Sequence, residues 1–201
     1  MNTNTIKPFA RQARLILREG VKQRLKYWGF TDNGQNNHKL ETTHGGYIFR
    51  GEIFTDTRIP QKWEKLKNKI TGKQALDDVV EEAAYCWFNR LMAVKILESN
   101  GYLPKYIGYT EGMRTPMIVQ EAKRGNYKPV TNKDQGLLHE YLQEDREEQA
   151  FGLLVTDLCN HHPLLQDVFG RIDDYTEMLL PQNLLQADGL LDLINGKNIP
   201  D

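Results

Sequence analysis

A broad apolar stripe between Leu76 and Leu97 constrains the fold more than any other feature of this 201-residue chain. Its apolar residues recur at steps of three and four, which is the spacing of one helix face. A helix with so wide an apolar surface is normally covered on more than one side. We therefore expect a central helix at about residues 74–99, roughly 37 Å long, that ends at Asn100-Gly101. The stripe consists of Leu76, Val80, Ala83, Trp87, Leu91 and Val94, widened by Val79, Ala84, Phe88, Met92 and Ile96 or Leu97.

The remaining segments indicate a mainly α fold with a minor β element. The turn-rich residues 30–45 are expected to form a loop. Residues 46–55 place aromatic and β-branched side chains around Arg50-Gly51, which predicts a small β-hairpin packed on helices. The expected helices are residues 4–28, 59–70, 74–99, 116–123 and 134–160, followed by short helices in "HHPLLQDVFG" and "DDYTEMLLPQNLL".

Charge is divided unevenly along the chain. Residues 1–73 contain 15 Lys and Arg against 6 Asp and Glu, whereas residues 134–201 contain 3 against 14. A basic end and an acidic end on one chain suggest separate tasks. Two interpretations stay open. Either the basic end contacts phosphate while the acidic end faces solvent or a basic partner, or the two ends attract each other within the fold.

Basic side chains recur on one face of the first expected helix. Such a face can contact several phosphates in a sequence-independent, salt-sensitive way, so we expect it to contact DNA; the alternative is a solvated helix face. A second basic cluster lies in and after a later loop and has the same two interpretations. The expected DNA-contacting residues are Lys7, Arg11, Arg14, Arg18 and Lys22 on the first face, and Arg114, Lys123 and Arg124 in the second cluster.

The sequence contains no catalytic or metal-binding motif. It has no GxSxG nucleophile, no P-loop and no GxGxxG. The group from Cys159 to His162 lacks the second, separated pair of ligands that a zinc site requires, so no metal site is expected. Because Arg90 and Lys95 interrupt the best apolar run, no stretch reaches the ~20 residues of a membrane span. Cysteines without a paired spacing favour a reduced, cytoplasmic setting.

The stretch Trp87-Phe88-Asn89-Arg90 places an amide and a guanidinium inside an apolar run. Trp87 and Phe88 are expected to anchor the core. No residue one helical turn from Arg90 is acidic, so a buried Arg90 needs a partner from elsewhere in the fold. We expect a structural clamp between Arg90 and an acid of "DDYTE", because arginine matches carboxylates in a bidentate way. The alternatives are solvent exposure and contact with DNA or a cofactor. The candidate acids are Asp173, Asp174 and Glu177.

Several short segments are specific in combination, although none is a catalytic signature by itself. Over essentially the whole chain they resemble the N-terminal region of the large adenine-specific DNA methyltransferases of BREX phage-defence systems, the PglX-like family. The resemblance implies a bacterial enzyme that transfers a methyl group from S-adenosylmethionine to the exocyclic amine of adenine, usually after base flipping. The segments are, in order, "MNTNTIKPFARQAR", "YIFRGEIF", "IPQKWEKL", "VVEEAAYCWFNRLMAVKILESNGY", "PMIVQEAKRG", "LLVTDLCN" and "DDYTEMLLPQNLL".

That chemistry depends on a glycine-rich cofactor motif and an Asn-Pro-Pro-Tyr-type motif, and the sequence contains neither. The resemblance therefore implies that residues 1–201 form a single non-catalytic helical domain, with S-adenosylmethionine bound only by the full-length parent. Its implied partners are DNA, the catalytic domain of the same polypeptide and other phage-defence proteins, with no membrane. The alternative is a protein-interaction module that docks other defence components through its acidic C-terminal third, without DNA contact.

Overall fold

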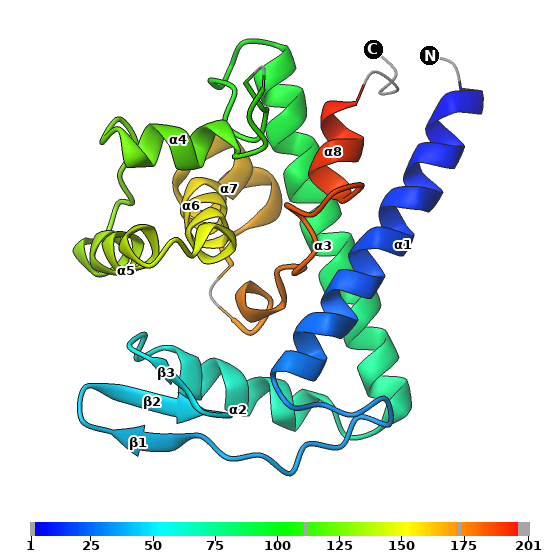
Figure 1. The fold of residues 1–201 in the computed structure, drawn as a ribbon. Coiled ribbons are helices and arrows are strands. Elements are labelled where there is room, and N and C mark those ends of the chain that lie inside the picture. Colours follow the sequence, from blue (N-terminus) through cyan, green and yellow to red (C-terminus); the bar gives the residue numbers. More distant parts are fainter. Residues whose placement is uncertain (1–2, 111, 173, 197–201) are drawn as a thin grey trace.

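The computed structural model describes residues 3–110, 112–172 and 174–196. It consists mainly of helices with one three-stranded antiparallel sheet, so the expected fold class is confirmed (Figure 1). None of the helices in these ranges has the length and apolar character that crossing a bilayer requires. The elements are α1 (Thr3–Tyr27), β1 (Glu41–Thr43), β2 (Gly46–Phe49), β3 (Glu52–Phe54), α2 (Ile59–Lys69), α3 (Lys73–Ser99), α4 (Met117–Lys123), α5 (Asn132–Gln143), α6 (Glu147–His161), α7 (Pro163–Phe169), the 3-10 turn η1 (Glu177–Leu179) and α8 (Leu190–Asn195).

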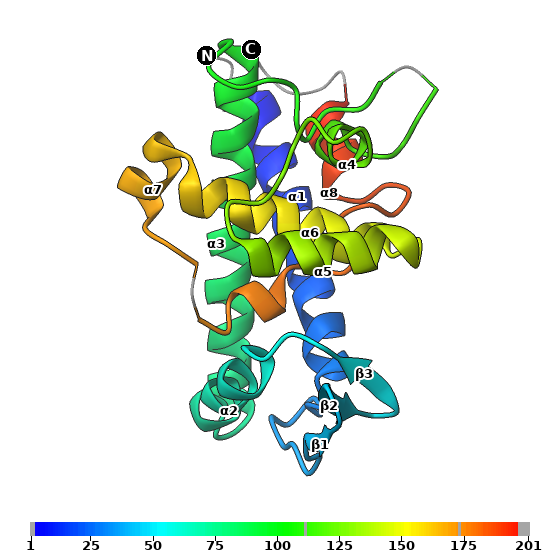
Figure 2. The same cartoon turned by 90° about the vertical axis from the view of Figure 1, so that its left-hand side faces the viewer.

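Helix α3 is the long central helix that its apolar stripe predicts (Figure 2). Helix α1 packs along it and α7 contacts it as well. Trp87 is 0% exposed, and its indole Nε1 donates a hydrogen bond to the carbonyl oxygen of Thr176 at 3.1 Å. Phe88 is half-buried, with its ring centroid 6.4 Å from that of Phe9 in α1. The wide stripe is therefore covered by early and late parts of the chain together.

Gly20 lets the late segment around Pro181 approach the backbone of α1. A Cβ added at Gly20 would lie 2.7 Å from the Cβ of Pro181 and would clash with the amide oxygen Oδ1 of Asn183. The side-chain Nδ2 of Asn183 in turn donates to the carbonyl of Ile16 at 2.9 Å. Glycine is thus required in the middle of α1 because another chain segment occupies the space of a side chain.

Replacing Gly20 by alanine is therefore expected to destabilise the protein, although alanine is the better helix former. Overpacking of this kind costs roughly 1–3 kcal/mol. The same substitution at Gly136 in α5 is the matched control, because an added Cβ there meets no atom within 4 Å. It is expected to stabilise by up to about 1 kcal/mol. Thermal denaturation of both single variants checks the opposite signs, and a Gly20→Ala protein as stable as the parent would contradict the close packing.

The small sheet contains the expected hairpin and one additional strand. Strands β2 and β3 pair antiparallel, with Ile48 opposite Ile53. Arg50 and Gly51 both have positive φ, 50° and 86°, as tight hairpin turns require. Phe49 buries its ring against Trp28 and Trp63, at centroid distances of 5.5 and 5.6 Å. The sheet is thus fixed to the C-terminal end of α1 and to α2 by aromatic packing.

Three sequence expectations about the elements are wrong. Part of the expected loop 30–45 is strand β1, which pairs with β2; three residues are too few to show an alternating pattern. The expected helix 134–160 is divided into α5 and α6 at Asp145, whose φ of 53° is left-handed and ends a helix. The segment after Tyr175 forms only the short turn η1 in place of an α-helix, since Pro181 follows closely.

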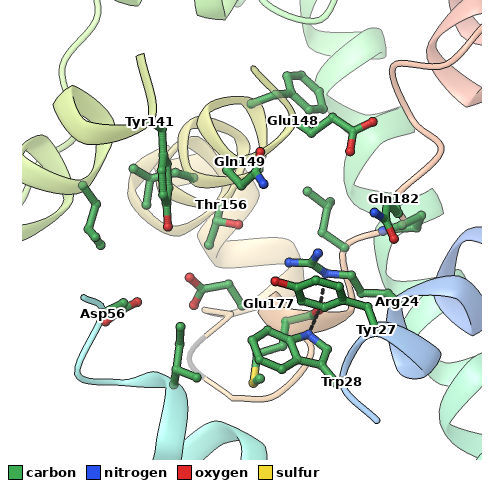
Figure 3. A pocket seen from close by; sticks show the side chains of 18 of the residues that line it. Arg24, Tyr27, Trp28, Asp56, Tyr141, Glu148, Gln149, Thr156, Glu177 and Gln182 are labelled. Atoms are coloured by element: carbon green, nitrogen blue, oxygen red, sulfur yellow. Dashed lines mark hydrogen bonds between the residues drawn. The ribbon is translucent and has the colours of Figure 1, made fainter. Parts of the chain in front are cut away.

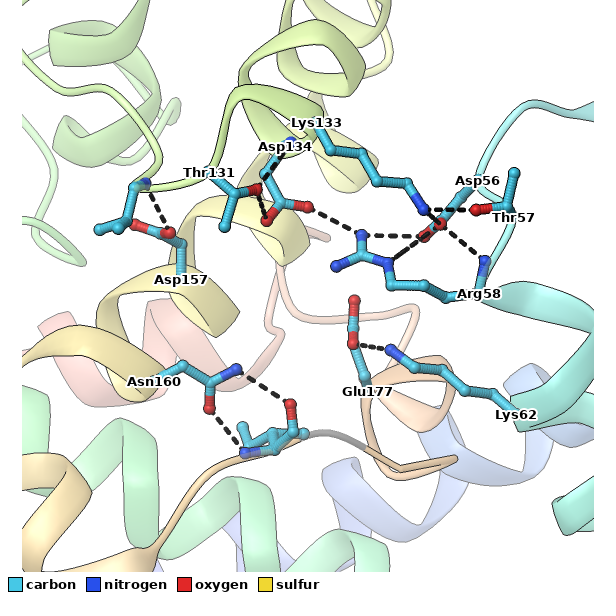
Figure 4. Close-up of polar contacts among 12 residues, drawn as sticks. Asp56, Thr57, Arg58, Lys62, Thr131, Lys133, Asp134, Asp157, Asn160 and Glu177 are labelled. Carbon is cyan, nitrogen blue, oxygen red and sulfur yellow. Dashed lines mark hydrogen bonds and ion pairs between the residues drawn. The ribbon is translucent and has the colours of Figure 1, made fainter.

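Ion pairs of partly buried side chains join the basic and acidic parts of the chain (Figure 4). Arg58 contacts the carboxylates of both Asp56 and Asp134, at 2.9 and 2.8 Å. Lys133 also contacts Asp56, at 3.0 Å. Burial alone would raise the pKa of Asp56, but the hydrogen bonds and charges of Arg58 and Lys133 outweigh burial and lower this pKa. A second pair joins Lys62 of α2 to Glu177 of η1. These pairs support the interpretation that the two ends attract each other.

Candidate functional site

The basic face of α1, defined here as Lys7, Arg11, Arg14, Arg18 and Lys22, lies at the surface. Its position follows from the buried side of the same helix, where Ala13, Leu17 and Val21 lie in the core. Lys7, Arg11 and Arg14 are exposed, whereas Arg18 and Lys22 are half-buried. The helix therefore presents a row of cations, of which the first three are exposed.

One acidic residue of α3, Glu81, lies against this face. Its Oε2 is 3.0 Å from a guanidinium nitrogen of Arg14, and its Oε1 is 2.7 Å from one of Arg18. A single carboxylate thus bridges two arginines, as a phosphate group could. Among the described residues, Lys7, Arg11 and Lys22 form no ion pair. The basic face is therefore partly neutralised in its middle and open at both ends.

The second basic cluster is not a continuous patch. Each of its three predicted contact residues has an acidic partner of its own. Arg114 pairs with Asp192 of α8, Lys123 with Glu147 at 2.6 Å, and Arg124 with Glu121 at 2.7 Å. Arg114 and Lys123 thus join neighbouring elements, while Arg124 pairs within the end of α4, so the structure favours the basic face of α1 as the candidate phosphate-binding surface.

Arg90 is buried and links α3 to the end of α7. One terminal nitrogen of its guanidinium donates to the carbonyl oxygen of Phe169 at 2.9 Å, and the other lies 2.7 Å from Sγ of Cys86. The guanidinium carbon also lies 5.4 Å from the centroid of the Phe169 ring. Asn89, next to it, is half-buried. Arg90 therefore forms a tertiary clamp, but with backbone carbonyl groups.

The expected carboxylate partners of Arg90 are accordingly corrected. Within the described residues, neither Asp174 nor Glu177 forms an ion pair with Arg90. Asp174 accepts a hydrogen bond from the backbone N–H of Thr176 at 2.8 Å, and Glu177 pairs with Lys62. Asp173, the third candidate, lies outside the described residues. Every residue has a backbone carbonyl group, so no residue type marks it as the acceptor. The sequence therefore indicated the acidic side chains as partners.

A cleft that the sequence did not reveal opens where the end of α1 meets α5, α6 and the segment 177–185 (Figure 3). Its volume is about 270 Å³. Arg24 lies at its base, and Tyr141, Gln149 and Thr156 face it from the helices above. Arg24 could not be singled out from the sequence, because it follows the basic face of α1 as one more cation of a basic helix.

Comparison with known proteins identifies relatives that cover nearly the whole chain. The adenine-specific methyltransferase BrxX of Escherichia coli O9:H4 (strain HS) is 28% identical over 198 residues, which is 95% of this chain. The adenine-specific methyltransferase PglX of Lacticaseibacillus casei (strain Zhang) is 30% identical over 201 residues, or 89% of this chain. The chain is a relative of BrxX and PglX. No family model matches it.

The kinship with BrxX and PglX confirms the resemblance that the sequence segments suggested. The chain spans about 16% of the length of each of these curated relatives. The activity named for BrxX and PglX therefore describes much longer proteins, and its transfer to this chain is a proposal.

Proposed function

We propose that this chain is a non-catalytic helical domain of an adenine-N6-specific, S-adenosylmethionine-dependent DNA methyltransferase of a bacterial phage-defence system. In this role it supports the catalytic domain of the same polypeptide, which holds the cofactor, and helps to engage DNA. The relation to BrxX and PglX supports the enzyme class. One observation carries DNA engagement: the basic face of α1 is exposed, and Lys7 and Arg11 have no acidic partner among the described residues.

DNA engagement by α1 predicts duplex binding that weakens steeply with salt. In a plot of log affinity against log salt concentration, removal of one phosphate-binding cation should make the slope less steep by roughly one. Fluorescence anisotropy with a labelled duplex compares the parent with a triple alanine variant of Lys7, Arg11 and Lys22. A matched control removes the same charge at exposed lysines elsewhere. The control residues are Lys39, Lys65 and Lys105.

The triple variant of the basic face is expected to lose most of the binding, while the control keeps most of it. Equal losses in both variants would mean that only net charge matters, which contradicts a defined interface on α1. Failure of the parent chain to bind duplex at low salt would also contradict the proposal.

The substitution Glu81→Gln is expected to strengthen DNA binding. The carboxylate of Glu81 competes with phosphate for Arg14 and Arg18, and the neutral amide would release both arginines. We expect affinity at low salt to rise about three- to tenfold, since ion pairs at exposed positions are individually weak. The control is Glu82→Gln, which removes an equal charge one residue further along α3. Among the described residues, Glu82 pairs with Lys69 and not with the basic face. An affinity that responds equally to both substitutions would contradict the competition.

The second candidate function is a protein-interaction module without DNA contact. Helix α7 favours it, because Leu164 and Val168 are apolar and yet 50% and 71% exposed. Acidic residues of the C-terminal third, including Asp167 on the same helix, lie at the surface. The anisotropy measurement separates the two functions, since the interaction module requires no affinity for duplex DNA.

A further inference from the structure

The cleft at the end of α1 contains the guanidinium of Arg24, which forms no ion pair with any described residue, although the more distant carboxylates of Glu148 and Glu52 act on it through space. The Nε of Arg24 donates to the carbonyl oxygen of Met178 at 3.0 Å. The guanidinium carbon lies 4.7 Å from the ring centroid of Tyr27 and 5.6 Å from that of Trp28, which fixes its plane (Figure 3). Its two terminal nitrogens bond to no other described residue. Burial lowers the pKa of Arg24, so an anion at this position would be stabilising.

Most acids that line the cleft already have partners. Glu52 accepts a hydrogen bond from the hydroxyl of Tyr27, Asp56 is held by Arg58, and Glu177 pairs with Lys62. Glu148 is the remaining acid of the lining; it is exposed and forms no ion pair with Arg24 within the part of the chain that the structure describes. Arg24 therefore keeps two donors available to a group that enters from outside.

Other polar side chains at the cleft can each donate a hydrogen bond. The hydroxyls of Tyr141 and Thr156 and the amide of Gln149 face the space above Arg24 (Figure 3). Among the described residues, none of the three has a side-chain hydrogen bond to another side chain. Donors that face the same space suit an oxyanion. The rest of the lining is largely apolar and includes Leu137, Phe151, Leu153, Leu180, Leu184 and Leu185.

We propose that this cleft binds a small monocarboxylate, with the carboxylate paired to Arg24 and an apolar body against the leucines of α5, α6 and the 180–185 segment. Planar guanidinium nitrogens match the two oxygens of a carboxylate. A volume of about 270 Å³ lies just below the usual range of ligand sites and so suits a small acid. Glu52 and Glu148 at the lining disfavour a nucleic-acid strand, whose successive phosphates would meet these acids.

Nuclear magnetic resonance titration of the full chain tests this site. The probes are hexanoate and phenylacetate, and the matched neutral probes are hexanamide and phenylacetamide. The reporters are the Arg24 Nε–H and the indole N–H of Trp28, because both donate to the carbonyl of Met178. The indole N–H of Trp87, bonded to Thr176, serves as an internal reference. At least one of the two acids is expected to shift both reporters at millimolar concentration, and its matched amide is expected to bind at least tenfold more weakly.

Two substitutions move the affinity in opposite directions. Arg24→Gln is expected to weaken acid binding about tenfold or more, because the neutral amide cannot form the charge-assisted hydrogen bonds. Glu148→Gln removes a repelling charge at the mouth of the cleft and is expected to strengthen binding about two- to fivefold. Glu148→Gln still tests the proposal if Arg24→Gln does not fold. The proposal is overturned if neither acid shifts the reporters, if amides bind as well as acids, if Glu148→Gln has no effect, or if a DNA oligonucleotide displaces the acid.

Discussion

Replacing Trp87 by alanine is expected to lower the free energy of unfolding by about 4 kcal/mol. The side chain is 0% exposed at the centre of α3, and its truncation removes packing with several elements at once. It also removes the hydrogen bond that the carbonyl oxygen of Thr176 accepts from the indole N–H. Since globular proteins are stable by only about 5–15 kcal/mol, this one change removes a large share of the total. Urea denaturation followed by circular dichroism measures it.

Two further substitutions divide this effect into its causes. Trp87→Phe keeps much of the apolar volume but removes the hydrogen bond to Thr176, and should cost less than half as much as alanine. Tyr85→Ala, two residues earlier on α3 but 71% exposed, is expected to change stability by no more than about 0.5 kcal/mol. A Trp87→Ala protein that resembles Tyr85→Ala in stability would contradict the central position of this helix.

Replacing Arg58 by alanine is expected to cost about 3 kcal/mol at neutral pH. Asp56 and Asp134 are 8% and 7% exposed, and without Arg58 these two carboxylates face each other with Lys133 as the remaining cation. The cost should be lower in a triple variant that also carries Asp56→Asn and Asp134→Asn, because no buried charge is then left unpaired. Denaturation of the single and triple variants compares the two cases, and a triple variant no better than the single one would contradict this account.

The pH dependence of the Arg58 effect has a defined sign. The pKa of Asp56 is lowered in the folded protein, so its contribution to stability is present above the unfolded-state pKa of about 3.9. That contribution is lost as the pH falls through the lower, folded-state pKa. The difference between parent and Arg58→Ala should therefore be largest near neutral pH and shrink as the pH falls below about 4 and Asp56 becomes protonated. Thermal melts between neutral and acidic pH follow this difference.

The helices follow from the sequence because their signal is local. The stripe of α3 repeats along the whole helix, so its bounds at Lys73 and Ser99 agree with the expected 74–99. Strand β1 has three residues and depends on pairing with β2, which no local pattern encodes. The break at Asp145 depends on one left-handed residue in a segment that otherwise favours helix.

The candidate sites are harder to predict from the sequence, because they depend on contacts between distant segments. Helical spacing alone placed the basic face of α1 outward, but the pairing of Arg14 with Glu81 joins residues 67 positions apart. The cleft around Arg24 is assembled from several separate segments of the chain. Arg90 shows the limit most clearly: the need for a distant partner could be inferred from its neighbours, whereas the choice of a backbone carbonyl could not.

The glycine contact in α1 also has a consequence for the order in which the protein is made. Gly20 receives its packing from Pro181 and Asn183, which are among the last parts of the described chain to be synthesised. The first helix can dock on α3 once residues up to 99 have left the ribosome, but its other side stays uncovered until the late segment follows. Such distant contacts slow folding and leave apolar surface open in the meantime. Any shortening of the chain before residue 181 should therefore leave the first helix exposed to misfolding and proteolysis.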